Sequence, residues 1–304
     1  MNVACVVPTY NNKRDLERLL DSLEGQRAAF DVLIVDSSST DGTRELGKAR
    51  AHKFSVVASA AFNHGGTRQQ MVNENFDYDI YVFLTQDACL LESNAISELL
   101  ALFNDENVGA VCGRQMPHSD ATIYAQHARH YNYPRKTQIR TIKDAKRLGI
   151  KTAFMSNSFA AYRGSALKTV GGFPSDVIFA EDMYVAARML VSGWKVAYAG
   201  AAVCAHSHNY TILEEFRRYF DMGVFHARES WIGATFGHVG GEGLKYQISE
   251  LKFIGLKRPV TCLLSMVRSA AKLTGYQLGK RERFLPVYLK RRFGMHRAYW
   301  NNSI

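Results

Sequence analysis

Short apolar runs alternate with amphipathic segments over roughly the first 110 residues of the chain. Mostly apolar runs rich in β-branched or aromatic side chains occupy residues 3–8, 31–35, 54–58, 80–84 and 108–112. Such runs predict strands that are buried on both faces. Between them, apolar residues recur at helical spacing, as at Leu16, Leu19, Leu20 and Leu23. Because strand and helix alternate, the pattern predicts right-handed crossovers and a mostly parallel sheet flanked by helices.

The pattern changes after residue 113. Residues 114–151 are polar, basic and rich in Tyr and His, so we expect a long, partly mobile excursion near the site. Regular patterns resume at 153–162 and predict helices at 164–170 and 181–193, followed by a strand at 194–199. From Tyr210 onward the sequence is largely helical. We therefore expect a sheet domain over residues 1–210 and a helical region over 211–304.

Carboxylates stand where several of these elements begin or end. Asp36 closes one predicted strand, Asp87 follows the apolar run 80–84, and the pair Glu181 and Asp182 opens a helix. Ends of parallel strands meet at one sheet edge, where open α/β folds bind ligands. Taken singly, Asp87 could cap the helix near Ser93, and Glu181 could be a helix cap. Three such positions at one edge favour a binding site instead.

A glycine-containing turn, Asn63 to Arg68, opens another predicted helix. Glycine lets the backbone approach an anion, and helix N-termini favour negative charge, so the turn could lie near phosphate. Its spacing matches neither the dinucleotide fingerprint nor the P-loop. A dehydrogenase and a P-loop NTPase are therefore disfavoured.

Charge and cysteine content refine this picture. Residues 245–304 hold 13 Lys and Arg against 2 Asp and Glu, whereas the first 244 residues hold 25 against 26. The basic end suggests an anionic partner, either a membrane or nucleic acid. The five scattered cysteines lack a CxxC pair, which argues against zinc and disulfides and fits a reducing compartment. The N-terminus lacks a signal-peptide pattern, and no run is long enough to span a membrane.

Seven short motifs carry a resemblance to a known family. They are Val7-Pro8-Thr9-Tyr10-Asn11, the stretch 35–43, Asn63-His64-Gly65-Gly66-Thr67-Arg68, Thr85-Gln86-Asp87-Ala88, Gly171-Gly172-Phe173, Glu181-Asp182 and His206-Ser207-His208. In order and spacing, roughly residues 1–215 resemble a family 2 glycosyltransferase. The resemblance implies an α/β GT-A fold, Rossmann-like, with a helical C-terminal extension. The forms of the third and fourth motifs are similar to bacterial rhamnosyltransferases that use dTDP-rhamnose.

The resemblance assigns a nucleotide pocket to residues early in the chain. Pro8, Thr9, Tyr10 and Asp36 would form its walls, with Asp36 accepting a hydrogen bond from the base. Asn63, Gly66 and Arg68 would lie near base and diphosphate.

Gln86 and Asp87 occupy the position of the family's DxD motif. Thr85 stands where the first aspartate is usual, so Asp87 is the one carboxylate available. The resemblance implies Mg²⁺ or Mn²⁺ on the diphosphate, which neutralises the leaving group. His206 or His208 would supply a further ligand, although a lone histidine is more often structural.

Asp182 resembles the family's catalytic base. Inverting transfer needs a carboxylate that takes the proton of the acceptor hydroxyl as that oxygen attacks the anomeric carbon. Glu181 is the alternative base, or it could hold the acceptor.

The implied activity is rhamnosyl transfer from dTDP-rhamnose to a lipid-linked or growing surface polysaccharide. A UDP-hexose donor is the nearest alternative. The degenerate Thr85-Gln86-Asp87 also allows a catalytically silent nucleotide- or glycan-binding protein. The segment from Phe253 to Leu278 mixes apolar residues with Lys257, Arg258, Arg268 and Lys272, and predicts amphipathic helices whose basic faces lie on an anionic membrane. We therefore expect a cytoplasmic protein peripheral to the membrane, with helices that could pair subunits, and no motif supports nucleic-acid binding.

Overall fold

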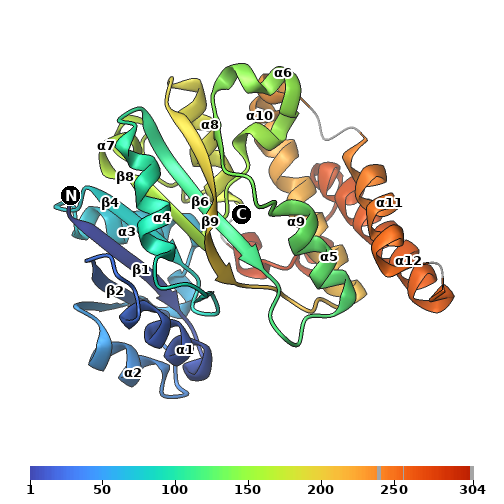
Figure 1. Cartoon of the computed structure of the whole chain (residues 1–304). Coiled ribbons are helices and arrows are strands. Elements are labelled where there is room, and N and C mark those ends of the chain that lie inside the picture. Colours follow the sequence, from blue (N-terminus) through green and yellow to red (C-terminus); the bar gives the residue numbers. More distant parts are fainter. Residues whose placement is uncertain (238–240, 256, 302–304) are drawn as a thin grey trace.

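The computed structural model describes residues 1–237, 241–255 and 257–301, and within them nine strands form one mixed sheet (Figure 1). The strand order is β3-β2-β1-β4-β8-β6-β9-β5, and β7 also pairs with β9. The strands are β1 (Val3–Thr9), β2 (Asp31–Asp36), β3 (Lys53–Val56), β4 (Ile80–Leu84), β5 (Cys89–Leu90), β6 (Val108–Met116), β7 (Gln138–Arg140), β8 (Phe159–Arg163) and β9 (Lys195–Ala205).

The predicted α/β sheet is confirmed, with one addition in its centre. Strands β1 to β4 pair in parallel, and β6 pairs in parallel with β9. Between β4 and β6 lies β8, which is antiparallel to both. Strands β1, β2, β3, β4, β6 and β9 consequently run in one direction. Leu84, at the end of β4, pairs with Phe159, at the start of β8. Residues just before β8 therefore join the edge formed by the carboxyl ends of the parallel strands.

Helices cover both faces of the sheet. They are α1 (Lys13–Glu24), α2 (Thr43–Arg50), α3 (His64–Glu74), α4 (Ala95–Leu100), α5 (Ile123–Asn132), α6 (Ala145–Leu148), α7 (Gly164–Thr169), α8 (Glu181–Val191), α9 (Ile212–Arg228), α10 (Ser230–Phe236), α11 (Glu242–Ile254), α12 (Pro259–Lys280) and α13 (Val287–Phe293). Alternate residues of a strand face opposite sides of a sheet. Val3, Cys5 and Val7 accordingly join a core with α1 and α4, whereas Ala4 and Val6 join a core with α7, α8 and α9.

The predicted irregular excursion at 114–151 is wrong. This segment holds the end of β6, α5, β7 and α6, and β7 adds to the sheet beside β9. Its polar residues are not all solvent-facing, since His127 and Arg140 are buried. The Arg140 guanidinium donates to the carbonyls of Lys151 and Phe154 at 2.7 and 2.9 Å. Polar side chains that form hydrogen bonds with buried backbone groups cannot be told from exposed loop residues by sequence polarity alone. The break expected after residue 199 is also absent, because β9 continues to Ala205.

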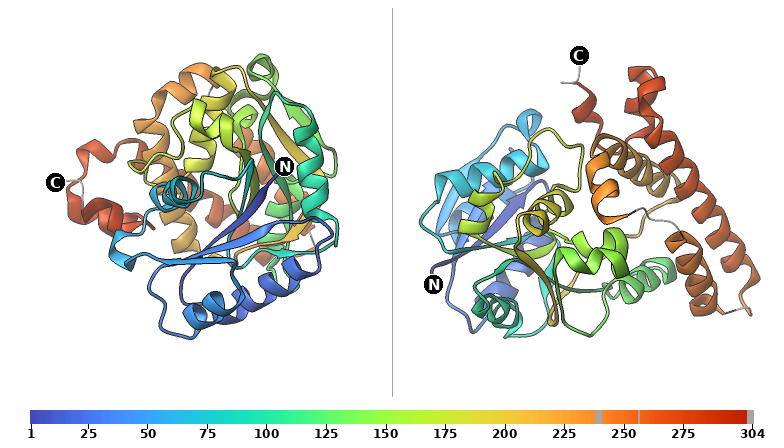
Figure 2. Two further views of the ribbon diagram at one scale, coloured as in Figure 1. Left: turned by 90° about the vertical axis from the view of Figure 1, so that its left-hand side faces the viewer. Right: turned by 90° about the horizontal axis from the view of Figure 1, so that it is seen from above.

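The helical C-terminal region begins at α9, as expected, and packs on itself through α9 and α12 (Figure 2). Phe220 and Val224 of α9, together with Trp300, belong to the same apolar core as α8. A boundary near residue 210 therefore remains a prediction, since this core runs across it.

Helices α9 and α12 approach closely because glycines of α12 lie against the α9 backbone. A Cβ atom on Gly279 would lie 2.0 Å from the Phe220 carbonyl oxygen, and one on Gly275 would lie 2.3 Å from that of Phe216. The contact therefore excludes even a methyl group at these positions.

We predict that Gly279→Ala destabilises the protein, because the methyl group collides with backbone that cannot move independently. Overpacking of this kind costs about 1–3 kcal/mol. Gly243→Ala in α11 is the matched control, since a Cβ there meets nothing within 4 Å. It should raise stability by up to about 1 kcal/mol through helix propensity. Urea unfolding of both variants measures the difference, and equal effects would contradict the close contact.

Candidate active site

Asp36 organises the loop at the carboxyl end of β2. Its side chain is fully buried. Oδ1 accepts hydrogen bonds from Thr9 Oγ1 at 3.0 Å and Ser39 Oγ at 2.6 Å, and Oδ2 accepts from the Ser39 amide at 2.8 Å. Asp36 thereby joins the ends of β1 and β2, with Pro8 half-buried and Tyr10 exposed beside it. Contact between Asp36 and a base stays a prediction.

Gln86 joins the end of β4 to the end of β1. Its Oε1 accepts from the Tyr10 amide at 2.9 Å, and its Nε2 donates to the Tyr10 carbonyl at the same distance. The side-chain amide thus extends the pairing of two parallel strands beyond their ends. This pairing places Tyr10 and Asp87 on neighbouring stretches of backbone.

Asp87 lies against both predicted histidines. Its Oδ2 is 3.4 Å from His206 Nε2 and 3.8 Å from His208 Nδ1, and the three candidate ligand atoms lie within 4.8 Å of one another. Asp87 does not cap the following helix, since α4 begins at Ala95 after Asn94 and has no side-chain cap. The structure therefore brings together the three residues expected to hold a metal.

A buried glutamine sets the tautomer of His206. Gln115, at the end of β6, is fully buried, and its Oε1 lies 2.9 Å from His206 Nδ1 and 3.0 Å from Arg129 Nη1. A guanidinium can only donate, so the atom facing it must be the amide oxygen. His206 Nδ1 must then donate to that oxygen. In the neutral imidazole this leaves Nε2 unprotonated and facing Asp87.

The protonation states fit a cation between these groups. Burial lowers the pKa of His206 and of His208, so both are neutral at neutral pH. Burial raises the pKa of Asp87, and the lowering by His206 and His208 applies when they carry a proton, so the neutral histidines leave its carboxylate without a compensating charge. Two acceptors, Nε2 and Oδ2, thus face each other at 3.4 Å. That separation suits two ligands of one ion at about 2.1 Å each, so the residues fit a divalent metal.

Glu181 and Asp182 are held by Asn157, two residues before β8. The Asn157 amide donates to Asp182 Oδ2 at 3.0 Å, and its side-chain Nδ2 donates to Glu181 Oε1 at 2.9 Å. Tyr162 donates to Asn157 Oδ1 at 2.7 Å and fixes that amide. Ala180 precedes the pair with φ of 62°, a left-handed conformation uncommon outside glycine. The orientation of Glu181 and Asp182 is therefore fixed both by the Asn157 hydrogen bonds and by the backbone turn at Ala180.

The two carboxylates differ in environment. Glu181 is buried and pairs with the Arg68 guanidinium at 3.1 Å, whereas Asp182 is half-buried. Burial disfavours the ionised form of Glu181, but Arg68 and His64 outweigh it and lower its pKa. Burial and the neighbouring Glu181 charge together raise the pKa of Asp182 well above its ordinary range. Such divergence within an adjacent pair is typical of acid–base sites.

The turn from Asn63 to Arg68 supports this pair. Arg68 is buried and committed to Glu181, and Asn63 caps α3 while its Nδ2 donates to the Ser175 carbonyl at 2.9 Å. Gly66 donates its amide to the cap oxygen at 2.7 Å. Contacts of Asn63, Gly66 and Arg68 with base and diphosphate stay predictions. The turn packs against the segment leading into α8, where a Cβ on Gly65 would lie 1.8 Å from the Pro174 carbonyl oxygen.

Gln115 also connects the two halves of the site. Its Nε2 donates to Ser156 Oγ at 2.8 Å, and Ser156 precedes Asn157. A chain of contacts therefore runs from His206 through Gln115 and Ser156 to the backbone that holds Asp182. Our sequence reasoning missed Gln115 and Asn157. The available signals were a glutamine in an apolar strand and the polar triplet 156–158 before another.

Solved structures share this fold. The chain aligns over 99% of its length, and 85% of the other chain, with the mannosyltransferase PcManGT of Pyrobaculum calidifontis in complex with GDP-Man and Mn²⁺, with a TM-score of 0.60 and 18% identity. It aligns over 98%, and 88% of the other chain, with residues 1–349 of TarS from S. aureus, with a TM-score of 0.58 and 16% identity. These neighbours confirm the predicted GT-A fold.

Two curated proteins are similar to this chain over nearly its whole length. It is 47% identical to "O-antigen chain rhamnosyltransferase WbaN" of Salmonella anatum, covering 98% of this chain and 95% of that protein. It is 46% identical to "O-antigen chain rhamnosyltransferase RfbN" of Salmonella typhimurium, covering 99% and 97%. The family model "Glycosyl transferase family 2" matches residues 4–171. The chain therefore belongs to glycosyl transferase family 2 and is an inverting glycosyltransferase.

Proposed function

We propose that this enzyme transfers L-rhamnose from dTDP-β-L-rhamnose to a hydroxyl group of a lipid-linked or growing O-antigen-type polysaccharide. The observation that carries the proposal is the near full-length identity of 47% and 46% to two proteins named O-antigen chain rhamnosyltransferases. The site supports it by combining an oriented carboxylate with a candidate metal cluster.

Asp182 is the proposed catalytic base. The acceptor oxygen forms a bond to the anomeric carbon of the donor while the bond from that carbon to the diphosphate oxygen breaks. The electron pair leaves with dTDP, and the hydroxyl proton passes to an oxygen of Asp182. The raised pKa of Asp182 makes it a stronger base than an exposed aspartate. Glu181 is bound to Arg68 and Asn157, so its proposed role is to orient and polarise Asp182.

Asp87, His206 and His208 are the proposed ligands of a divalent ion. A bound ion of this kind neutralises charge on the leaving diphosphate. Two nitrogen ligands favour Mn²⁺ over Mg²⁺, which prefers oxygen. Gln115 keeps the lone pair of His206 Nε2 directed at Asp87. With one carboxylate in the set, the two imidazoles compensate for the aspartate that Thr85 replaces.

The nucleotide is proposed to bind at the joined ends of β1, β2 and β4. Tyr10 is 54% exposed there and offers a ring face to a base. Thr9 and Asp36 are buried beneath it and shape the loop that would contact the base. Gln86 fixes the Tyr10 backbone, so its proposed part in binding is indirect.

An anionic membrane surface is the proposed partner of the C-terminal region, at the cytoplasmic face where the acceptor would be presented. The concentration of positive charge in residues 245–304 supports this partner. In the part of the chain that the structure describes, no helix combines the length and hydropathy needed to cross a bilayer.

The donor is tested with the purified enzyme, Mn²⁺ and a panel of nucleotide-sugars. We expect release of dTDP from dTDP-rhamnose and little turnover of UDP-hexoses. Asp182→Asn should lower turnover by about 10²–10⁴-fold while donor binding, measured by calorimetry, is retained. Preferred turnover of a UDP-hexose would overturn the donor assignment, and binding of every donor without turnover would favour a silent binding protein.

The pH profile tests the environment of Asp182. Its carboxylate must be ionised to accept a proton, so kcat/KM should fall as pH drops through its raised pKa. The acid limb should therefore lie well above the ordinary range of aspartate. Glu181→Gln removes the negative charge that helps to raise the pKa of Asp182, and it leaves the positive charge of Arg68 in place. The acid limb of the pH profile should therefore move to lower pH by about one unit. An acid limb that stays in place would argue against Asp182 as the titrating group.

Metal binding tests the role of Gln115. Gln115→Met removes the acceptor for His206 Nδ1–H, and a lost supporting contact typically weakens metal binding about 10–100-fold. Gln115→Glu keeps an acceptor and should bind Mn²⁺ nearly as tightly as the wild type. Electron paramagnetic resonance of Mn²⁺ in the presence of dTDP gives the dissociation constants, and imidazole nitrogen chemical shifts report the tautomer. Equal Mn²⁺ affinity in both variants would show that Gln115 does not position the ligand.

A further inference from the structure

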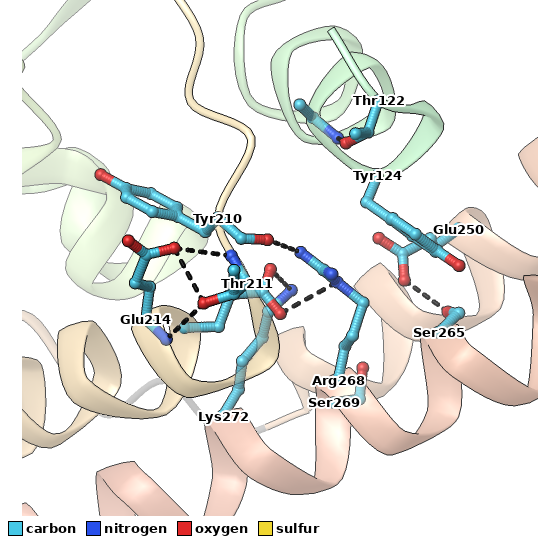
Figure 3. A network of polar contacts seen from close by, with 12 residues as sticks. Thr122, Tyr124, Tyr210, Thr211, Glu214, Glu250, Ser265, Arg268, Ser269 and Lys272 are labelled. Carbon is cyan, nitrogen blue, oxygen red and sulfur yellow. Dashed lines mark hydrogen bonds and ion pairs between the residues drawn. The ribbon is translucent and has the colours of Figure 1, made fainter.

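Helix α12 turns its polar side chains inward. Figure 3 shows Arg268 and Lys272 of α12 in a network of polar contacts. Both form ion pairs with Glu215 of α9, at 3.1 and 3.2 Å. Arg268 also donates to the Tyr210 carbonyl at 2.6 Å, and its guanidinium lies over the Tyr124 ring. Both cationic side chains are only 12% exposed. The sequence predicted that these two residues belong to an exposed basic face. This prediction is wrong, because both side chains form ion pairs with the buried carboxylate of Glu215.

The same inner face continues along the helix. Ser265 is fully buried and donates to Glu250 of α11 at 2.5 Å, while Gln247 donates to Ser265 at 2.9 Å. Toward the C-terminal end, Gly275 and Gly279 meet the α9 backbone. Polar groups and glycines thus fix which side of α12 faces the protein.

The opposite face of α12 is apolar and open to solvent. Its side chains between residues 260 and 273 are 43–70% exposed, namely Val260, Leu263, Leu264, Met266, Val267 and Leu273. The charged residues within this span are the inward-facing Arg268 and Lys272. Water-soluble surfaces rarely carry an uncharged apolar strip of this length without a partner. In Figure 1, α11 and α12 project together from the sheet domain.

Exposed cations stand at both ends of this apolar face. Lys257 and Arg258 precede α12, and Lys280, Arg281 and Arg283 follow its outer strip. Glu282, between the last two, is buried and paired with Arg228 and Lys290. The positive charge at the ends is therefore not offset by this neighbouring acid.

We propose that the outer face of α12 docks in the plane of an anionic lipid bilayer. Its apolar side chains would enter the boundary between head groups and acyl chains, and the terminal cations would contact lipid phosphates. The inference deepens the proposed membrane contact and depends on neither donor nor acceptor.

Charge decides between a bilayer and a second copy of this chain. Pairing two α12 helices antiparallel sets Lys257 and Arg258 of one copy against Lys280 and Arg281 of the other. Pairing them parallel places each basic end of one copy against the same basic end of the other copy. Like charges meet in both arrangements, which disfavours self-association. Anionic lipid supplies the opposite charge along the whole helix.

The test is flotation of the full chain with vesicles of phosphatidylcholine, with or without phosphatidylglycerol. Leu263→Gln/Val267→Gln removes two outer side chains and should weaken binding to the anionic vesicles by at least about tenfold. Phe76→Gln/Leu91→Gln removes two exposed apolar side chains from the sheet domain and is the matched control, with unchanged binding expected. Lys257→Gln/Arg258→Gln should weaken binding and reduce its dependence on salt.

Three outcomes would overturn the proposal. They are wild-type vesicle binding by the Leu263→Gln/Val267→Gln variant, equal binding to neutral and anionic vesicles, and a wild-type dimer in light scattering that this variant dissociates. Release of dTDP in the absence of lipid is measured on the same samples. Loss of vesicle binding with intact release supports the docking face. Absence of release from the wild type would bear on the proposed function alone.

Discussion

The buried side-chain amide of Gln115 is the contact on which the rest of the site depends. Its Oε1 accepts hydrogen bonds from Arg129 and His206, and its Nε2 donates one to Ser156. Arg129 fixes which end is oxygen, and the oxygen then dictates the tautomer of His206. The nitrogen end reaches Ser156, beside the residue that holds Asp182. A group with no solvent access has no water to substitute for a lost partner. The geometry of the candidate metal cluster and that of Asp182, the proposed base, are therefore coupled through one side chain.

Antiparallel strand β8 makes this coupling geometrically possible. A chain that ran strictly as parallel crossovers would deliver only strand ends and helix starts to the ligand-binding edge. Because β8 runs the other way, the residues before it also arrive at that edge, next to the end of β4. Ser156 and Asn157 occupy this position. Glu181 and Asp182 are consequently held by the residues that lead into β8, whereas the loops after β1 and β2 are held by Asp36 and Gln86.

Buried ion pairs explain two departures from the sequence-based expectations. Arg68 and Arg268 both looked available for an anionic ligand, and both are committed to a carboxylate inside the protein. A cation with an internal partner loses its attraction for an external one, because its charge is already compensated. In the C-terminal region the proposed contact with a lipid surface is therefore assigned to the apolar face of α12 and the cations at its ends.

Sequence alone determined strands β1 to β4 and β6, the helix positions of Glu181 and Asp182, and the proximity of Asp87 to His206 and His208. Hydrophobic periodicity and the shared edge of parallel strands carry that information, and the family motifs locate it. Tertiary structure decided the partners of Arg68, Gln115 and Asn157, the order within segment 114–151, and the direction in which α12 turns. These depend on contacts between residues far apart in the chain, such as Gln115 with His206 and Glu215 with Arg268. A polarity pattern records that a side chain is polar, and only the packed structure shows whether its partner is water or protein.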